Sequence, residues 1–145
     1  MYAFKKYHDL PASYFCYPIA VAIAIMLGYA AISKLLDYSH TKSEMMNQIF
    51  PRSIALQLAW LVPLIELIIC GLLLFKSTQL IGFCAAALLM TIFSLYISIT
   101  MTGIFGRIPC SCGGILGNMG YHLHLLFNLF FLLLSLAGIA IKLDL

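Results

Sequence analysis

The sequence predicts an all-α integral membrane protein, a four-helix bundle with a short interfacial helix between spans one and two. Of the 145 residues, 63% are hydrophobic and 9% are charged, whereas a soluble domain carries about 25% charged residues. Four apolar runs each approach or exceed the ~20 residues that a helix needs to cross the hydrocarbon core. The length indicates one domain over residues 1–145. The formal net charge of +3 is small and does not indicate a nucleic acid partner.

The four runs set the boundaries of the expected spans, at residues 15–36, 54–75, 80–101 and 121–141. A backbone surrounded by lipid must satisfy its own hydrogen bonds, so we expect helices rather than strands. The first run is longer than the core of a signal peptide, which has about 7–15 apolar residues. This length favours an uncleaved first span.

The connections between the spans differ in length. The turn KSTQ at residues 76–79 predicts an antiparallel hairpin of spans two and three. In residues 37–53, Thr41 and Glu44 fit a capping box, which predicts a short surface helix that ends before Pro51. The third connection, residues 102–120, contains PCSCGGILGN. With four spans, it lies on the same side as the surface helix and opposite both termini.

The distribution of Lys and Arg gives a weak indication of orientation. Four Lys or Arg residues lie on the side of the termini and four on the side of the two longer connections. Of the second four, Lys34 falls within the first expected span. If Lys34 is not counted as a loop charge, the positive-inside rule favours cytoplasmic termini. Residues 37–53 and 102–120 are then expected on the outer face.

The two cysteines of PCSCGGILGN are candidates for redox exchange. Cys110 and Cys112 are close enough to bond, but the ring that they would close is small and strained. Strain makes a disulfide easier to reduce, which suits exchange better than structural stapling. Arg107 stands three residues earlier with no acidic residue nearby, so the local field favours a thiolate.

Two alternatives for this pair remain open, metal binding and passive loop cysteines. A metal site would add His122 and His124 to the two thiols. The one-residue spacings are shorter than those of structural zinc sites, and the two histidines point to different faces of a helix. The sequence therefore disfavours a metal site, and no residue is assigned as a metal ligand. The remaining cysteines are expected to behave as small hydrophobes out of reach of the pair; they are Cys16, Cys70 and Cys84.

Polar side chains within the spans predict a cluster beneath the cysteine-containing connection. Glu66 lies near the middle of span two, where an ionisable group is costly and either functional or paired to lock the bundle. His124 and Asn128 are one helical turn apart and share a face. Lys34 and Asp37 are close enough for a local pair, and a direct Lys34–Glu66 bridge is not expected because Glu66 lies deeper. The other members of the cluster are Tyr29 and Tyr96.

Three stretches together resemble the methylamine-utilisation MauE family, which is related to the DoxX-like membrane proteins. They are AAISKLLD, PLIELIICGLLL and PCSCGGILGNMGYHLHLLFNLFFLLL, and the resemblance spans all four expected helices. Tyr121 stands where such proteins often have tryptophan. The residues that match the family pattern are Lys34, Asp37, Glu66, Cys110, Cys112, His124 and Asn128.

The resemblance implies an inner-membrane protein that supports maturation of disulfide-containing periplasmic proteins, together with a thioredoxin-like partner. It implies a redox role for Cys110 and Cys112, with Glu66, His124 and Asn128 as a supporting polar cluster. DoxX-like relatives are linked to quinone-dependent oxidation, so a quinone is the candidate cofactor. Its candidate pocket is walled by Glu66, Tyr96, His124 and Asn128. Whether the chain is itself a thiol–disulfide oxidoreductase stays open.

Three other functions compete with this interpretation. A non-enzymatic membrane scaffold or export subunit would dock a partner through the third connection (the docking scaffold), with the cysteine pair as a structural clip. A DoxX-like subunit would be linked to a quinone. A small-molecule carrier would use Glu66 and Lys34 within the membrane.

Overall fold

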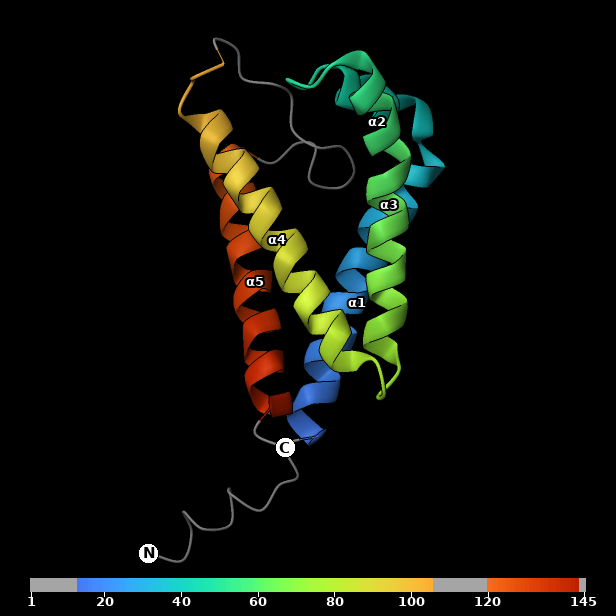
Figure 1. Cartoon of the computed structure of the whole chain (residues 1–145), viewed down its shortest axis with the longest axis vertical. Coiled ribbons are helices and arrows are strands. Elements are labelled where there is room, and N and C mark those ends of the chain that lie inside the picture. Colours follow the sequence, from blue (N-terminus) through green and yellow to red (C-terminus); the bar gives the residue numbers. More distant parts are fainter. Residues whose placement is uncertain (1–12, 106–119, 144–145) are drawn as a thin grey trace, which may run out of the picture.

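The computed structural model describes residues 13–105 and 120–143, and these residues form five α-helices (Figure 1). Four of the helices are long and apolar enough to cross a membrane. Each has at least 23 residues, or about 34 Å of helical rise. The helices are α1 (Ser13–Leu36), α2 (Tyr38–Met46), α3 (Arg52–Leu74), α4 (Gln79–Met101) and α5 (Tyr121–Leu143). The predicted fold class is confirmed, and the span boundaries differ by at most two residues.

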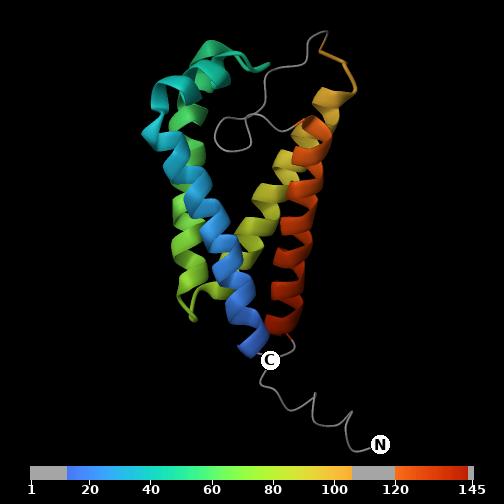
Figure 2. The same cartoon turned by 180° about the vertical axis from the view of Figure 1, so that it is seen from behind.

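The long helices associate mainly in two pairs, α1 with α3 and α4 with α5. Figures 1 and 2 show the beginning of α1 and the end of α5 at one end of the bundle. The short helix α2, the end of α4 and the beginning of α5 lie at the opposite end. The interfacial helix therefore lies opposite the beginning of α1 and the end of α5, as predicted. Most of the third connection lies outside the described residues, so its placement stays a prediction.

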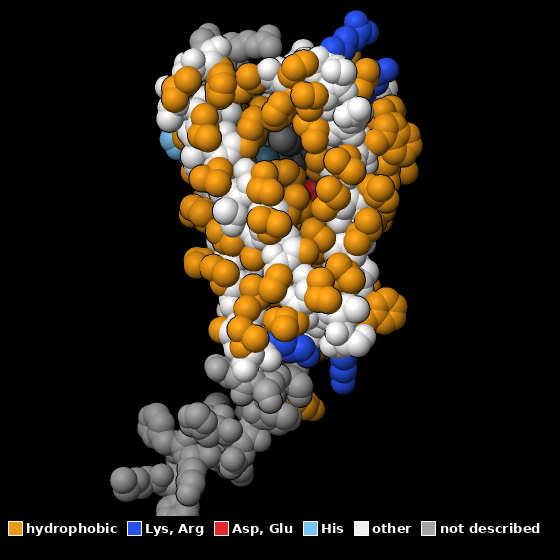
Figure 3. Space-filling view, viewed as in Figure 1, with side chains coloured by type: hydrophobic (Ala, Val, Ile, Leu, Met, Phe, Trp, Pro, Cys, Tyr) orange, Lys and Arg blue, Asp and Glu red, His pale blue; other side chains and the backbone are white. Residues whose placement is uncertain are grey.

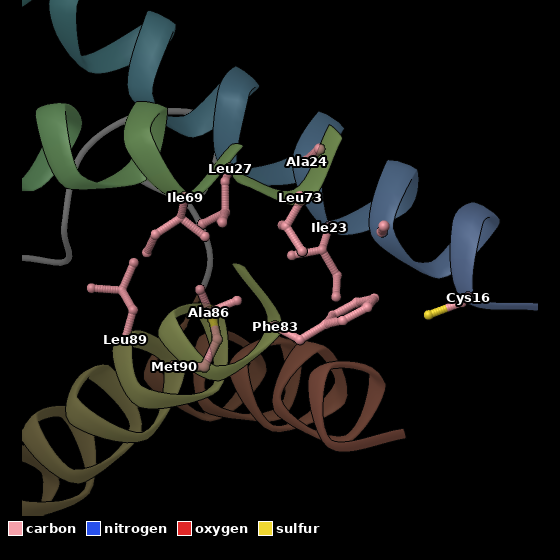
Figure 4. Close-up of a cluster of buried hydrophobic side chains, with 11 residues drawn as sticks. Cys16, Ile23, Ala24, Leu27, Ile69, Leu73, Phe83, Ala86, Leu89 and Met90 are labelled. Atoms are coloured by element: carbon pink, nitrogen blue, oxygen red, sulfur yellow. The ribbon is translucent and has the colours of Figure 1, made fainter. Parts of the chain in front are cut away.

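The hydrophobic core fills the half of the bundle nearer the termini. In Figure 4, Phe83 of α4 and Leu73 of α3 point toward Ile23 of α1. Phe83 is completely buried. A Cβ atom built on Gly138 of α5 would lie 2.5 Å from Cε1 of the Phe83 ring, so only glycine permits this approach of α5 to α4.

The turn between α3 and α4 satisfies backbone groups that the end of α3 leaves without helical partners. The Thr78 hydroxyl donates to the carbonyl of Leu72 at 2.9 Å, and the Gln79 amide donates to the carbonyl of Leu73 at 3.3 Å. Because these carbonyls would otherwise be unpaired near lipid, the bonds stabilise the tight turn. The predicted hairpin of spans two and three is confirmed.

The helix α2 begins earlier than the capping-box prediction. Asp37 is its N-cap, and its Oδ1 accepts a hydrogen bond from the backbone N–H of His40 at 3.2 Å. Thr41 instead donates its hydroxyl to the carbonyl of Lys34 at 3.0 Å. The prediction was wrong because the carbonyls at the end of α1 needed a donor, and Thr41 supplies it.

The outer surface of the bundle is apolar. Figure 3 shows hydrophobic side chains along the length of one face, with Lys and Arg at its two ends. Leu, Ile and Phe side chains on all four long helices are exposed. A contiguous apolar surface of this extent requires a lipid environment. The chain is a multi-pass membrane protein.

Candidate functional site

An ion pair inside the bundle joins α1 to α3. Lys34, in the last turn of α1, places its Nζ atom 2.5 Å from Oε1 of Glu66. The two side chains are 7% and 2% exposed. Each charge therefore has little access to solvent and depends on the other for compensation.

This pair corrects the sequence interpretation of both Lys34 and Asp37. A direct Lys34–Glu66 bridge was not expected, and a local Lys34–Asp37 pair was considered instead. The four-carbon stem of Lys34 extends into the bundle, whereas an interfacial lysine would extend toward water. Asp37 meanwhile uses Oδ1 to cap α2 and to accept from the Ser39 hydroxyl at 3.2 Å. The carboxylate of Asp37 thus bonds to groups of α2, whereas the ammonium of Lys34 bonds to Glu66 of α3.

The α5 helix contributes two buried polar side chains to the same region. His124 and Asn128 are 6% and 4% exposed, whereas His122 is exposed. The prediction that His124 and Asn128 share a face is confirmed, as is the prediction that the two histidines point in different directions. Within residues 13–105 and 120–143, no group of three His, Cys, Asp or Glu residues could hold a metal ion.

Glu66, His124 and Asn128 border a cavity of about 340 Å³ between the four long helices. Lys34 and Tyr96 also line it, so the cavity includes every residue of the proposed quinone pocket. Most other lining residues are apolar, among them Met90, Phe93, Ile97 and Phe127. Figure 3 shows a hollow on this face with histidine and acidic atoms visible inside it.

Two buried polar atoms at the cavity lack hydrogen-bond partners among the residues that the structure describes. They are Oε2 of Glu66 and Nδ2 of Asn128. A buried polar group without a partner costs about 1–3 kcal/mol. Both atoms could be satisfied by a molecule bound in the cavity, and an oxygen-bearing ligand could accept from the Asn128 amide. The donor set is thus compatible with a quinone.

A second polar contact joins α4 to the segment that follows α2. The Tyr96 hydroxyl donates to Oε1 of Gln48 at 2.5 Å, and the ring of Phe50 stacks on the Tyr96 ring with centroids 5.5 Å apart. Gln48 is almost completely buried. The sequence interpretation placed Tyr96 in the cluster but missed Gln48, because no motif or spacing distinguishes this glutamine from a loop residue.

The cysteines fall into two groups. Cys110 and Cys112 lie outside the described residues, so their placement stays a prediction. Cys16 is buried and Cys70 partly buried, as expected of small hydrophobic side chains, and the Cys70 thiol donates to the carbonyl of Ala24 at 3.3 Å. Cys84 differs from this expectation because it is exposed on the outer surface of α4.

The fold and the cavity define a class: a four-span membrane protein with a buried ion pair beside a mainly apolar cavity. Residues 12–141 match the family model described as methylamine utilisation protein MauE. The chain belongs to the MauE family, and this membership indicates a membrane protein associated with methylamine utilisation. Searches of curated proteins and of solved structures give no match.

Proposed function

We propose that the protein is a thiol–disulfide exchange component of the inner membrane. Cys110 and Cys112 exchange disulfides with a thioredoxin-like periplasmic protein, which in turn acts on disulfide-containing clients. One observation carries the proposal: the cavity that contains the buried polar cluster opens in the half of the bundle where α4 ends and α5 begins. The two cysteines belong to the connection between those helix ends.

The exchange needs only thiols and disulfides. A thiolate of one protein attacks a disulfide sulfur of the other, and a mixed disulfide forms as the second sulfur leaves as a thiolate. The second thiol of the attacking protein then resolves the mixed disulfide, so one disulfide is reduced while another is formed. The close spacing of Cys110 and Cys112 supports this role because a strained disulfide is readily reduced.

The proposal places both termini in the cytoplasm and the cysteine pair in the periplasm. The burial of Lys34 supports this orientation, since a lysine held inside the bundle by Glu66 does not act as a loop charge. Without it, residues 37–53 and 102–120 contain three positive residues, and the terminal side has four. The positive-inside rule then favours cytoplasmic termini.

The Lys34–Glu66 pair argues against the carrier function. A carrier that binds a cation at Glu66 needs a carboxylate free to receive it, but one carboxylate oxygen already contacts the Lys34 ammonium. The buried charges balance each other, so the pair is better suited to fixing α1 against α3. This leaves the docking scaffold and the quinone-linked subunit as the competing functions.

Serine variants of the cysteines test the proposal. In one of Cys110→Ser and Cys112→Ser, the remaining thiol should accumulate a reducible adduct with a periplasmic thioredoxin-like protein, because no second thiol resolves it. The double variant should form no adduct and should leave the client immature. Cys84→Ser is the matched control, since Cys84 lies on the outer surface of α4.

Protein levels decide how the result is interpreted. If the double serine variant reaches normal levels in the membrane and the client still matures, the exchange function is wrong and the docking scaffold is favoured. An adduct that forms equally with Cys84→Ser and with the single variants would also contradict the proposal.

A further inference from the structure

We infer that the cavity beside the Lys34–Glu66 pair binds the ring of a lipid-soluble quinone, with Asn128 as a hydrogen-bond donor to a ring oxygen. The choice of ligand class rests on the proposed exchange function. The existence of a site rests on the cavity itself. Three features of the cavity support the inference: its unpaired polar atoms, its apolar walls and its opening toward lipid.

The unpaired polar atoms favour a ligand with hydrogen-bonding groups over a pure hydrocarbon. Nδ2 of Asn128 needs an acceptor, and Oε2 of Glu66 needs a donor. Both side chains are more than nine-tenths buried and both line the cavity. A quinone carbonyl offers an acceptor, and the hydroxyl of the reduced quinol offers both an acceptor and a donor. A hydrocarbon chain offers neither, so it would leave both atoms unpaired.

The size and walls of the cavity fit a substituted ring. Its volume of about 340 Å³ lies near the lower limit of the roughly 300–1,000 Å³ that ligand pockets occupy. Aromatic side chains in the wall can pack against a flat ring. The apolar residues that surround the polar cluster include Ile25, Met26, Met90, Phe93, Ile97 and Phe127.

The opening of the cavity faces the side of the bundle. Figure 1 shows α3 and α4 joined at the turn near the termini and separated toward the other end. In Figure 3 the hollow lies between the regions that these helices occupy, surrounded by hydrophobic side chains. An opening bordered by hydrophobic side chains on the apolar outer surface favours a ligand that is lipid-soluble.

A quinone also matches the proposed thiol chemistry in electrons and protons. A bound quinone would supply an acceptor for two electrons and two protons, and a dithiol loses the same number when it becomes a disulfide. Lys34 contributes a fixed positive charge, and Glu66 and His124 can hold protons beside the ring. The residues of this chain thus provide binding, charge and proton sites in one place.

Photolabelling tests the inference without relying on activity. The probe is an azido-substituted decylubiquinone, added to the Cys110→Ser/Cys112→Ser protein in lipid nanodiscs, where no thiol exchange occurs at the pair. We expect saturable labelling of peptides from α3, α4 and α5 that line the cavity. Unlabelled decylubiquinone should compete with it, and decanol, which has the same chain length without a ring, should not.

Asn128→Leu is the decisive variant, because the Asn128 amide donor has no hydrogen-bond partner within residues 13–105 and 120–143. Loss of one hydrogen bond to the ligand should weaken the apparent affinity about five- to tenfold. Ser135→Ala is the matched control on α5, since the Ser135 hydroxyl bonds to the carbonyl of Phe131 within its own helix. The control should keep the wild-type affinity.

Several outcomes would overturn the inference. Labelling that does not saturate, that decanol removes equally well, or that Asn128→Leu leaves unchanged would each show that no ring-specific site exists. Specific labelling together with normal client maturation in the cysteine double variant would support the site and reject the exchange function. Absence of labelling together with lost client maturation in the cysteine double variant would reject the quinone site and support the exchange function.

Discussion

The Lys34–Glu66 pair makes a quantitative prediction about the stability of the bundle. We consider Lys34→Met and Glu66→Met, singly and together, because methionine is unbranched and suits a helix. Removing one partner leaves the other charge buried and uncompensated, which costs about 3–5 kcal/mol. With 7% and 2% of the two side chains exposed, solvent offers little relief, and each single variant should lose this much of its unfolding free energy.

The double variant should be more stable than either single variant. Replacing a buried ion pair by apolar side chains of similar volume is often neutral or stabilising. Glu66→Gln should lose less than Glu66→Met, because the amide oxygen can still accept a hydrogen bond from the Lys34 ammonium. These differences distinguish a charge effect from a packing effect.

Unfolding in mixed micelles with increasing dodecyl sulfate, followed by circular dichroism, measures these free energies. Lys76→Met is the matched control, because Lys76 is exposed in the turn between α3 and α4, and its effect should stay within about 0.5 kcal/mol. If the losses of the two single variants simply add in the double variant, the side chains do not compensate each other. A loss of unfolding free energy below about 1 kcal/mol in each single variant would contradict the claim that the remaining charge is buried without compensation.

Three further predictions concern other parts of the chain. Gly138→Ala places a Cβ atom 2.5–2.7 Å from three atoms of the Phe83 ring and should lower the unfolding free energy by about 1–3 kcal/mol through overpacking. In the same unfolding assay, adding Phe83→Leu should recover part of this loss. If the losses of the two substitutions simply add, the clash is contradicted. Asp37→Ala removes the N-cap of α2 and should weaken that helix by about 1 kcal/mol, seen as faster amide exchange in α2, whereas Asp37→Asn should retain the wild-type rate. A membrane-impermeant thiol reagent should label Cys110 or Cys112 in intact cells after mild reduction; labelling that appears only after the membrane is broken would reverse the proposed orientation.

The spans could be predicted from the sequence because lipid imposes a simple rule. A stretch of about 20 apolar residues must form a helix there, so boundaries follow from composition. The shared face of His124 and Asn128 follows from helical periodicity in the same way. These features depend on residues that are close along the chain, so they do not depend on how the helices pack against each other.

The Lys34–Glu66 pair could not be predicted because it depends on how α1 and α3 pack. Counting residues along each helix gives the depth of the Cα atoms but not the direction of a long side chain. The same limit explains Gln48, whose partner Tyr96 lies 48 residues away. Thr41 shows a different limit, since the capping-box pattern is local and the carbonyl that Thr41 bonds belongs to the preceding helix.

The close contact between Phe83 and Gly138 has a mechanical consequence for the cavity. Because the Phe83 ring lies directly on the α5 backbone at Gly138, this contact opposes sliding of α4 along α5. We therefore expect relative motion of the two helices mainly as rotation about this contact. A rotation of about 5° moves the far end of a 34 Å helix by about 3 Å. The displacement of α4 is therefore largest near its C-terminal end. The Tyr96–Gln48 hydrogen bond restrains α4 in that region.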